Sequence, residues 1–354
     1  MGSAVHTYSF INAKLRTRLS KLLSEETYDA LVRAPSLPEA VQLLKTTPYA
    51  LLETVYSKTG DIKSAELELY KTEMSVYHEV ERRMEGAPRR FCSALTTYYE
   101  VENLKRAVRL WFDHAIRGRD IEDSRGYLCR DVIHYDLHPD AIIQAPDYSG
   151  VVEALSDTPY ARFFGESVPE IQRMNSLFAF EIALDKYYYG ELHHAMHELS
   201  SADARIARRL VGVEVDLLNI NRVIRFKTIY NLPLSDAQKY SIPFGFEVDK
   251  ETIARAYDQD RVSEVFDALM KKHKGISAML KDQGQESSAR LVLIERVLEY
   301  VLMREVRRML VGNPFSIGIV LAYFILKKNE LRKIMTILNA KVYALKPEEI
   351  KSRL

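Results

Sequence analysis

Residues 34–50 read APSLPEAVQLLKTTPYA, and residues 145–161 read APDYSGVVEALSDTPYA. The two blocks lie 111 residues apart and agree at eight of 17 positions: Ala-Pro, one Val, one Leu and the whole Thr-Pro-Tyr-Ala end. Similarity of a chain to itself at a fixed offset indicates repeated structural units. We therefore interpret the shared Pro48-Tyr49 and Pro159-Tyr160 pairs as structural residues that have the same role in each copy.

A weaker third copy follows at an offset of 225 residues. Three copies of about 115 residues, 1–120, 121–236 and 237–354, account for the full length. This period is much longer than that of ordinary solenoid repeats, so each copy is predicted to be a small multi-helix lobe. The third copy is identified by matches between Glu26-Thr27 and Glu251-Thr252, Glu39 and Glu264, and Leu44 and Leu269.

A second pattern, acid-x-x-N-x-x-R-x-x-R, closes the first two copies at an offset of 116 residues. In the third copy, Asn329 and Arg332 keep the phase, while Leu326 and Met335 replace the acid and the last arginine. Two different blocks that recur in the same order strengthen the prediction of repeats. The full pattern consists of Glu100, Asn103, Arg106 and Arg109 in the first copy and of Asp216, Asn219, Arg222 and Arg225 in the second.

A helical wheel separates the roles of the residues in this pattern. Leu104, Val108 and Trp111 form an apolar stripe that must face a core, as do Leu217, Ile220 and Ile224 in the second copy. The acid and the asparagine lie at the edge of the stripe, where they suit hydrogen bonds to a neighbouring helix end, and the arginines point outward. Such arginines either pair with acidic surface residues, which contributes little, or line a surface where a partner docks. The candidate docking residues are Arg106, Arg109, Arg222, Arg225 and Arg332.

Helical periodicity dominates the remaining chain. Asp61 is the expected N-cap of a helix that runs to about Gly86, and a second long helix runs through Leu291 and Leu298 to a stop at Gly312. The apolar run 314–326 is too short to span a bilayer and is predicted to be a buried helix. Residues 127–135 fit either a short strand or a helix end. The predicted fold class is all-α.

Composition excludes several classes of function. The 50 basic and 49 acidic residues leave no overall field for nucleic acid or anionic lipid. The local run at residues 271–274, KKHK, is interpreted as a solvated helix face. Two cysteines, Cys92 and Cys129, are too few for a disulfide framework, and the N-terminus has no apolar signal core, so a reducing cytosol is expected.

The sequence contains no phosphate-binding, dinucleotide-binding or metalloprotease motif. The strongest metal candidate is the cluster of Glu191, His193, His194 and His197, but the sequence has no second Glu-x-x-His to complete a di-iron bundle site. A solvated or interfacial histidine cluster is the preferred interpretation. Likewise, Tyr187–Tyr189 are expected between packed helices rather than in a base-stacking site. We predict no catalytic residue, cofactor or metal.

The repeated blocks resemble those of the C subunit of A-type and V-type rotary ATPases, whose eukaryotic counterpart is the d subunit. The resemblance rests on YSFINAKLR at residues 8–16, on LLS at 22–24, and on Thr47-Pro48-Tyr49. It continues in the block 216–225 and in YFILKKNELR at residues 323–332. These motifs are in the family's order and cover essentially the whole chain.

The resemblance implies three helical lobes around a pseudo-threefold axis, which form a funnel on the membrane ring of proteolipid c subunits. It also implies a socket for the central shaft, made of the D and F subunits, and transmission of torque between ATP hydrolysis or synthesis and H⁺ or Na⁺ transport. Such a protein is non-catalytic, lies on the cytoplasmic side and touches the membrane only through the ring. The alternatives are a helical scaffold for other soluble proteins and, third, a helical-bundle metalloprotein.

Overall fold

The computed structural model describes residues 2–122, 128–226, 232–258, 261–273, 287–351 and 354. Across these ranges the regular elements are helices and no β-strand occurs, which confirms the all-α prediction. Residues 128–135 form irregular backbone rather than a strand or helix end, and residue 127 lies outside the described ranges. No helix among the described residues is long and apolar enough to cross a membrane.

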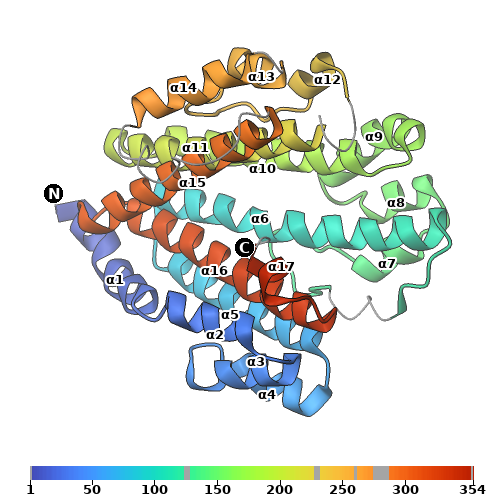
Figure 1. The fold of residues 1–354 in the computed structure, drawn as a ribbon, viewed down its shortest axis with the longest axis horizontal. Helices are drawn as coiled ribbons and strands as arrows, with labels where there is room; N and C mark the ends of the chain where they lie inside the picture. Colours follow the sequence, from blue (N-terminus) through green and yellow to red (C-terminus); the bar gives the residue numbers. More distant parts are fainter. Residues whose placement is uncertain (1, 123–127, 227–231, 259–260, 274–286, 352–353) are drawn as a thin grey trace. The chain divides into compact units, whose positions relative to one another are not determined.

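The chain, whose helices are labelled in Figure 1, divides into two compact units by its internal contacts. Unit 1 contains residues 1–177 and 322–354, and unit 2 contains residues 178–321. The three-lobe division at 1–120, 121–236 and 237–354 stays a prediction.

Unit 1 brings together helices from both ends of the chain. Helix α16 (Gly318–Val342) belongs to this unit from residue 322 onward. The other helices of unit 1 are α1 (Gly2–Leu19), α2 (Glu25–Arg33), α3 (Leu37–Leu43), the 3-10 turn η1 (Leu44–Thr46), α4 (Ala50–Thr59), α5 (Ile62–Arg82), α6 (Gly86–Trp111), the π-helical turn η2 (Phe112–Ile116), α7 (Pro139–Gln144), α8 (Tyr148–Ala154), α9 (Tyr160–Met174) and α17 (Pro347–Lys351).

Unit 2 is built on two long helices that pack against each other, α11 (Ser201–Arg225) and α15 (Ser287–Val311). Helix α15 confirms the second long helix predicted to end at Gly312. The shorter helices around this pair are α10 (Phe178–Glu198), α12 (Leu234–Lys239), α13 (Lys250–Tyr257) and α14 (Val262–Lys272).

Local sequence explains where α5 begins. The Asp61 carboxylate accepts the backbone N–H groups of Lys63 at 3.0 Å and Ser64 at 3.1 Å, which satisfies two of the unpaired donors at a helix start. The predicted N-cap is therefore confirmed. Gly60 precedes it with φ at +69°, the left-handed conformation that ends α4. Helix α5 ends at Arg82, short of the predicted end near Gly86; after residues 83–85, Gly86, also left-handed at +58°, begins α6.

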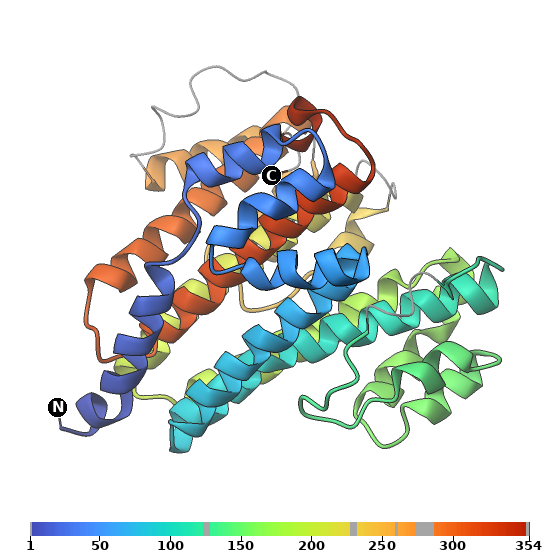
Figure 2. The same cartoon turned by 90° about the horizontal axis from the view of Figure 1, so that it is seen from below.

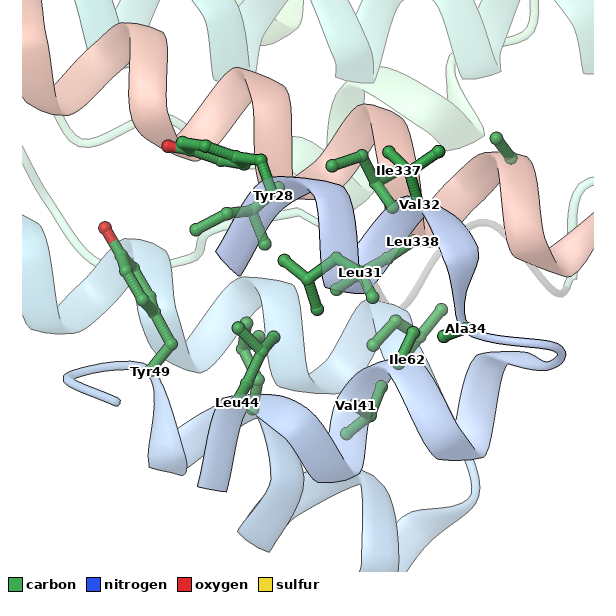
Figure 3. Close-up of a cluster of buried hydrophobic side chains, with 14 of the residues drawn as sticks. Tyr28, Leu31, Val32, Ala34, Val41, Leu44, Tyr49, Ile62, Ile337 and Leu338 are labelled. Atoms are coloured by element: carbon green, nitrogen blue, oxygen red, sulfur yellow. The ribbon is translucent and has the colours of Figure 1, made fainter. Parts of the chain in front are cut away.

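One core of unit 1 joins the N-terminal helices to α16. Leu31, Val41 and Leu44 from the N-terminal helices pack with Ile337 and Leu338 from α16, and all five side chains are buried (Figure 3). Figure 2 shows the same arrangement, with the blue N-terminal helices beside the red α16. Burial of a leucine or isoleucine side chain contributes about 1.5–3 kcal/mol. Helices α2 to α5 are therefore held to α16 and α17 near the C-terminus by one hydrophobic core.

The apolar run 314–326 forms part of α16. Residues Ile317 and Ile319–Ile325 are buried, as the sequence predicts, although the helix begins only at Gly318. The Ser316 hydroxyl accepts the backbone N–H of Gly318 at 3.3 Å at this helix start.

Candidate functional site

On α6, two buried polar side chains hold the irregular segment at residues 128–135. The Glu100 carboxylate accepts the backbone N–H groups of His134 at 2.7 Å and Tyr135 at 2.9 Å. The Asn103 amide donates to the Cys129 carbonyl at 2.8 Å and accepts the Cys129 N–H at 2.9 Å. The loop is not paired with a strand, so its buried backbone N–H and C=O groups need other partners. Glu100 and Asn103 supply them. The partners are loop amides, not the helix end that we expected from the sequence.

On α11, Asp216 and Asn219 make the corresponding contacts. The Asp216 carboxylate accepts the backbone N–H groups of Phe246 at 3.0 Å, Glu247 at 2.6 Å and Val248 at 3.0 Å. The Asn219 side-chain amide makes two hydrogen bonds to Ile242. It donates to the Ile242 carbonyl at 2.9 Å and accepts the Ile242 N–H at 2.8 Å. An acid and an asparagine three residues apart thus anchor a loop in both units. We call such an acid a loop anchor.

On α16, the loop anchor is Glu330 rather than a residue at the predicted position of the acid, Leu326. Its carboxylate accepts the Leu23 N–H at 2.6 Å and the Tyr49 hydroxyl. Leu23 and Tyr49 lie 111 residues before His134 and Tyr160, which is the offset of the repeated blocks. Since His134 and Tyr160 both donate to Glu100, Glu330 is the counterpart of Glu100.

These contacts differ from the phase that the sequence predicts for the third copy, in which Leu326 takes the position of the acid. Among the described residues, Asn329 does not form the pair of loop hydrogen bonds that Asn103 makes with Cys129. Its Oδ1 instead accepts a hydrogen bond from the Arg332 guanidinium at 2.9 Å, near the surface. Glu330, one residue further along the helix, points inward and is buried.

Each copy of the Thr-Pro-Tyr-Ala block places its tyrosine against a loop anchor: Tyr49 contacts Glu330, and Tyr160 contacts Glu100. In both copies the threonine hydroxyl donates to a carbonyl three residues earlier and accepts the tyrosine N–H. Pro48 and Pro159 lie between these residues, just before α4 and α9. The buried Tyr160 hydroxyl then donates to Glu100 at 2.6 Å, as Tyr49 does to Glu330. This geometry accounts for the identity of the two blocks.

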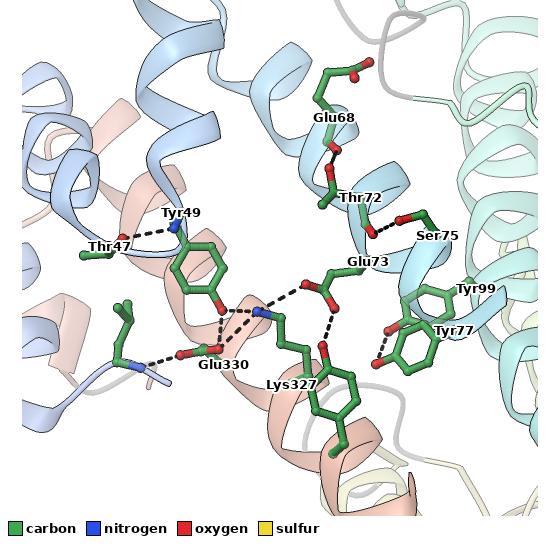
Figure 4. Close-up of polar contacts among 12 residues, drawn as sticks. Thr47, Tyr49, Glu68, Thr72, Glu73, Ser75, Tyr77, Tyr99, Lys327 and Glu330 are labelled. Carbon is green, nitrogen blue, oxygen red and sulfur yellow. Dashed lines mark hydrogen bonds and ion pairs between the residues drawn. The ribbon is translucent and has the colours of Figure 1, made fainter. Parts of the chain in front are cut away.

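A buried ionic network extends the Glu330 anchor (Figure 4). The Lys327 ammonium lies 3.4 Å from Glu330, 3.3 Å from Glu73 on α5, and 2.6 Å from the Tyr49 hydroxyl. The Tyr323 hydroxyl donates to Glu73 at 3.0 Å. Burial and the neighbouring Glu330 carboxylate raise the pKa of Tyr49 far above its ordinary value, so Tyr49 acts as a hydrogen-bond donor. Sequence reasoning missed this network because its members lie on three separate segments.

Asp216 should make folding pH-dependent. Burial raises its pKa from 3.8 to about 7, while its three amide donors oppose the shift. The folded state then keeps a proton that the unfolded chain releases near pH 4, so this contribution is full below pH 4 and declines as the pH rises to 7. We expect the wild type to lose up to about 1.4 kcal/mol per pH unit relative to Asp216→Asn across this window. Chemical denaturation followed by circular dichroism tests this; parallel pH profiles of the two proteins would contradict it.

The candidate docking arginines do not form one class. Arg106, Arg109 and Arg332 are exposed, and Arg106 lies 3.9 Å from Glu66. Arg222 is only 7% exposed, so the expectation that it points outward is wrong. Its guanidinium pairs with Asp185 on α10 and donates to the Tyr240 carbonyl at 3.3 Å, which joins α11 to its neighbours. The side chain of Arg225 lies outside the described part of the chain.

We expect Arg222→Ala to lower the free energy of unfolding by about 2–3 kcal/mol, because a hydrogen-bonded, largely buried ion pair is lost. Arg106→Ala is the control. Its side chain is exposed, and it should change stability by about 0.5 kcal/mol or less. Thermal melting of both variants distinguishes the roles. Equal melting temperatures would show that Arg222 contributes no more than a surface arginine.

The histidine cluster on α10 does not assemble a metal site. His193 stacks on Phe244 with ring centroids 3.9 Å apart and meets the His197 ring at 4.6 Å, while Glu191 and His194 are exposed. Within the ranges that the structure describes, no group of three or more His, Cys, Asp or Glu side chains could hold a metal. The interpretation as a solvated or interfacial histidine cluster stays a prediction.

Other predicted features vary in outcome. Tyr188 and Tyr189 are buried, as expected for tyrosines between packed helices. In the run 271–274, Lys271 and Lys272 are exposed, but His273 is buried, so it is no part of a solvated face. Lys274 lies outside the described residues.

Comparison with known families assigns the chain. Residues 11–353 match the model of the ATP synthase (C/AC39) subunit family, which covers nearly the full length. The chain belongs to this family. The resemblance that the repeated blocks indicate is thereby confirmed.

Archaeal relatives of this C/AC39 family member extend over the same length. The C subunit of the A-type ATP synthase of Methanocaldococcus jannaschii is 23% identical over 353 residues, covering 98% of this chain and 86% of that protein. The corresponding C subunits of Methanosarcina acetivorans and Methanosarcina mazei are 24% and 25% identical, each covering 98% of this chain and 92% of the relative. These matches extend over nearly the whole chain rather than over one motif.

Proposed function

We propose that the chain is a non-catalytic central-stalk component of an A-type or V-type rotary ATPase. It joins the rotating shaft, made of the D and F subunits, to the membrane ring of proteolipid c subunits. It passes torque between ATP hydrolysis or synthesis in the head and H⁺ or Na⁺ transport in the membrane. The observation that carries the proposal is the family match over residues 11–353.

The internal construction of each unit supports a load-bearing role. An adapter that transmits torque must keep its shape under force, and packed helices with saturated loop amides resist local opening. In unit 1 the two ends of the chain are tied by more than the shared apolar core. The Lys341 ammonium on α16 donates to the carbonyls of Val32 and Ala34, both at 2.6 Å. Together with Glu330, these bonds fasten α16 to the N-terminal segment at two points.

In this proposal the ATP-binding and ion-binding residues belong to other subunits. The chain is a peripheral subunit on the cytoplasmic side, in contact with the membrane only through the ring. The exposed members of the arginine set, Arg106, Arg109 and Arg332, remain candidates for partner contacts. The three lobes and the funnel around a pseudo-threefold axis are part of the same proposal.

The test is reconstitution of the rotary complex with and without this chain. Without it, the complex should still hydrolyse ATP but should transport neither H⁺ nor Na⁺ into vesicles. Adding the purified chain should restore transport. An affinity-tagged chain should also bring down the proteolipid c subunits together with the D and F subunits. Ion pumping that does not depend on the chain would refute the proposal. Co-purification with soluble proteins but without the proteolipid would favour a general scaffold.

A further inference from the structure

Unit 2 carries an exposed surface that combines aromatic and basic side chains, which we call the aromatic–basic face. Its aromatic residues are Phe244 and Phe246, 39% and 44% exposed, in the loop anchored by Asp216. The Arg209 guanidinium lies 5.5 Å from the centre of the Phe246 ring, and the Lys272 ammonium lies 5.7 Å from it. Cations at this distance are attracted to the ring. The basic residues of the face are Arg209, Lys272, Arg304 and Arg308.

Two acidic side chains that pair with these cations lie beneath them. The side chains of Glu247 and Glu305 are 4% and 2% exposed. Glu247 pairs with Lys272, while Glu305 pairs with Arg209 at 2.8 Å and lies within 4 Å of Arg304 and Arg308. Four cations thus cover two buried carboxylates. The surface is left with an excess of positive charge, which complements an acidic partner.

The loop that presents the two phenylalanines is held in one conformation. Besides the three bonds to Asp216, the Phe246 N–H lies 3.3 Å from the Gly212 carbonyl on α11. Phe244 has φ at +80°, a left-handed conformation that costs a bulky residue about 1–3 kcal/mol. Its ring stacks on His193. Fixed aromatic side chains lose little entropy on binding, so this surface is preorganised for a defined partner.

We propose that the aromatic–basic face docks an acidic segment of another protein subunit. The proposal rests on the proposed function, which places the chain among such subunits. Interfaces are enriched in aromatic residues and arginine. A lipid surface fits less well, because membrane-binding side chains reach about 5–10 Å into the headgroup boundary. More than half of the surface of each phenylalanine is covered, and His193 and Arg209 are among the neighbours.

The test measures binding of the full chain to the rotary complex assembled without it. Phe246→Ala should weaken binding about tenfold or more, the loss typical of a central aromatic contact. Arg308→Gln, at the most exposed cation of the face, should weaken binding several-fold and flatten its dependence on salt. Two matched controls lie in unit 1. Phe10→Ala removes an exposed ring that also has a cation over it, from Arg83 at 4.8 Å, and Arg162→Gln removes an exposed arginine paired with Glu166.

The outcomes separate this inference from the proposed function. If the wild-type chain does not bind the complex, the proposed function fails. If it binds and both variants on the face bind as tightly as the controls, the aromatic–basic face is not the docking surface. Melting temperatures show whether Phe246→Ala folds. If it does not fold, the binding of Arg308→Gln to the complex decides the test. If the two variants lose only binding to phosphatidylglycerol vesicles, the face binds lipid. If they lose only self-association, the face binds a second copy of the chain. Either result would overturn the proposal.

Discussion

Glu330→Ala is expected to lower the free energy of unfolding of unit 1 by about 3–5 kcal/mol, the cost of breaking a buried ion pair from one side. The substitution removes the acceptor for the Leu23 N–H and the Tyr49 hydroxyl. It also leaves the buried Lys327 ammonium with a single carboxylate partner, Glu73. Because these contacts join α16 to the N-terminal segment, the loss should destabilise both ends of the chain together.

The single tryptophan of the chain provides a local measurement. Trp111 is fully buried in unit 1, so its fluorescence reports unfolding of that unit in a denaturant titration. Asn329→Ala is the control on the same helix, where the side chain contacts Arg332 near the surface, and should change stability by about 0.5 kcal/mol or less. Glu330→Gln should fall between the two, since an amide oxygen still accepts the Leu23 N–H. If Glu330→Ala unfolds at the same denaturant concentration as Asn329→Ala, Glu330 is not a loop anchor.

The helical fold could be predicted because its determinants are local. Asp61 is followed by apolar residues at helical spacing, and the observed cap and helix α5 agree with that pattern. The apolar positions Leu104, Val108 and Trp111 on α6 are all buried, as the helical wheel requires. Helix boundaries depend on capping and periodicity within a few residues, and a single sequence contains that information.

The partners of the polar residues could not be predicted in the same way. A wheel places Arg222 only by its angle on α11, and the acid that pairs with it, Asp185, belongs to another helix. The third loop anchor was missed for a related reason. The sequence comparison kept the asparagine spacing and selected Asn329, whereas the structure preserves the contacts of the acid and therefore selects Glu330. Contacts between distant segments are constrained by three-dimensional geometry, which one sequence does not show.

The contacts also give the repeated blocks a physical meaning. A carboxylate on a long helix binds loop amides in all three sites, through Glu100, Asp216 and Glu330. Two of these sites add a tyrosine from a Thr-Pro-Tyr-Ala block. In the third, Asp216 takes three amides and no tyrosine from such a block among the described residues. The loop of that site carries the exposed phenylalanines, so it differs from the others where we expect a partner.

The Asp216 site leads to the second large prediction, Gly245→Ala. A Cβ atom at position 245 would collide with the Asp216 carboxylate and lie 2.7 Å from the Val248 carbonyl oxygen. The carboxylate cannot move away without breaking the hydrogen bonds that it accepts from the amides of Phe246, Glu247 and Val248. Overpacking costs about 1–3 kcal/mol, and each lost hydrogen bond to Asp216 adds about 0.5–1.5 kcal/mol where the carboxyl is protonated and about 1.5–3 kcal/mol where it is ionised, above pH 7. We expect a total loss of about 3–5 kcal/mol in the stability of unit 2.

Two other glycines, both inside helices, provide the controls for Gly245→Ala. At Gly190 on α10 an added Cβ meets nothing within 4 Å, so Gly190→Ala should stabilise by about 0.5–1 kcal/mol through helix propensity. At Gly212 on α11 an added Cβ would lie 2.8 Å from the Phe246 Cβ. This steric overlap should cancel the stabilisation from helix propensity in Gly212→Ala. Hydrogen exchange at the amides of Phe246, Glu247 and Val248 should accelerate in Gly245→Ala and stay slow in Gly190→Ala. Unchanged exchange in Gly245→Ala would mean that the loop tolerates the methyl group without leaving Asp216, and that the close approach at this glycine does not hold the aromatic–basic face in place.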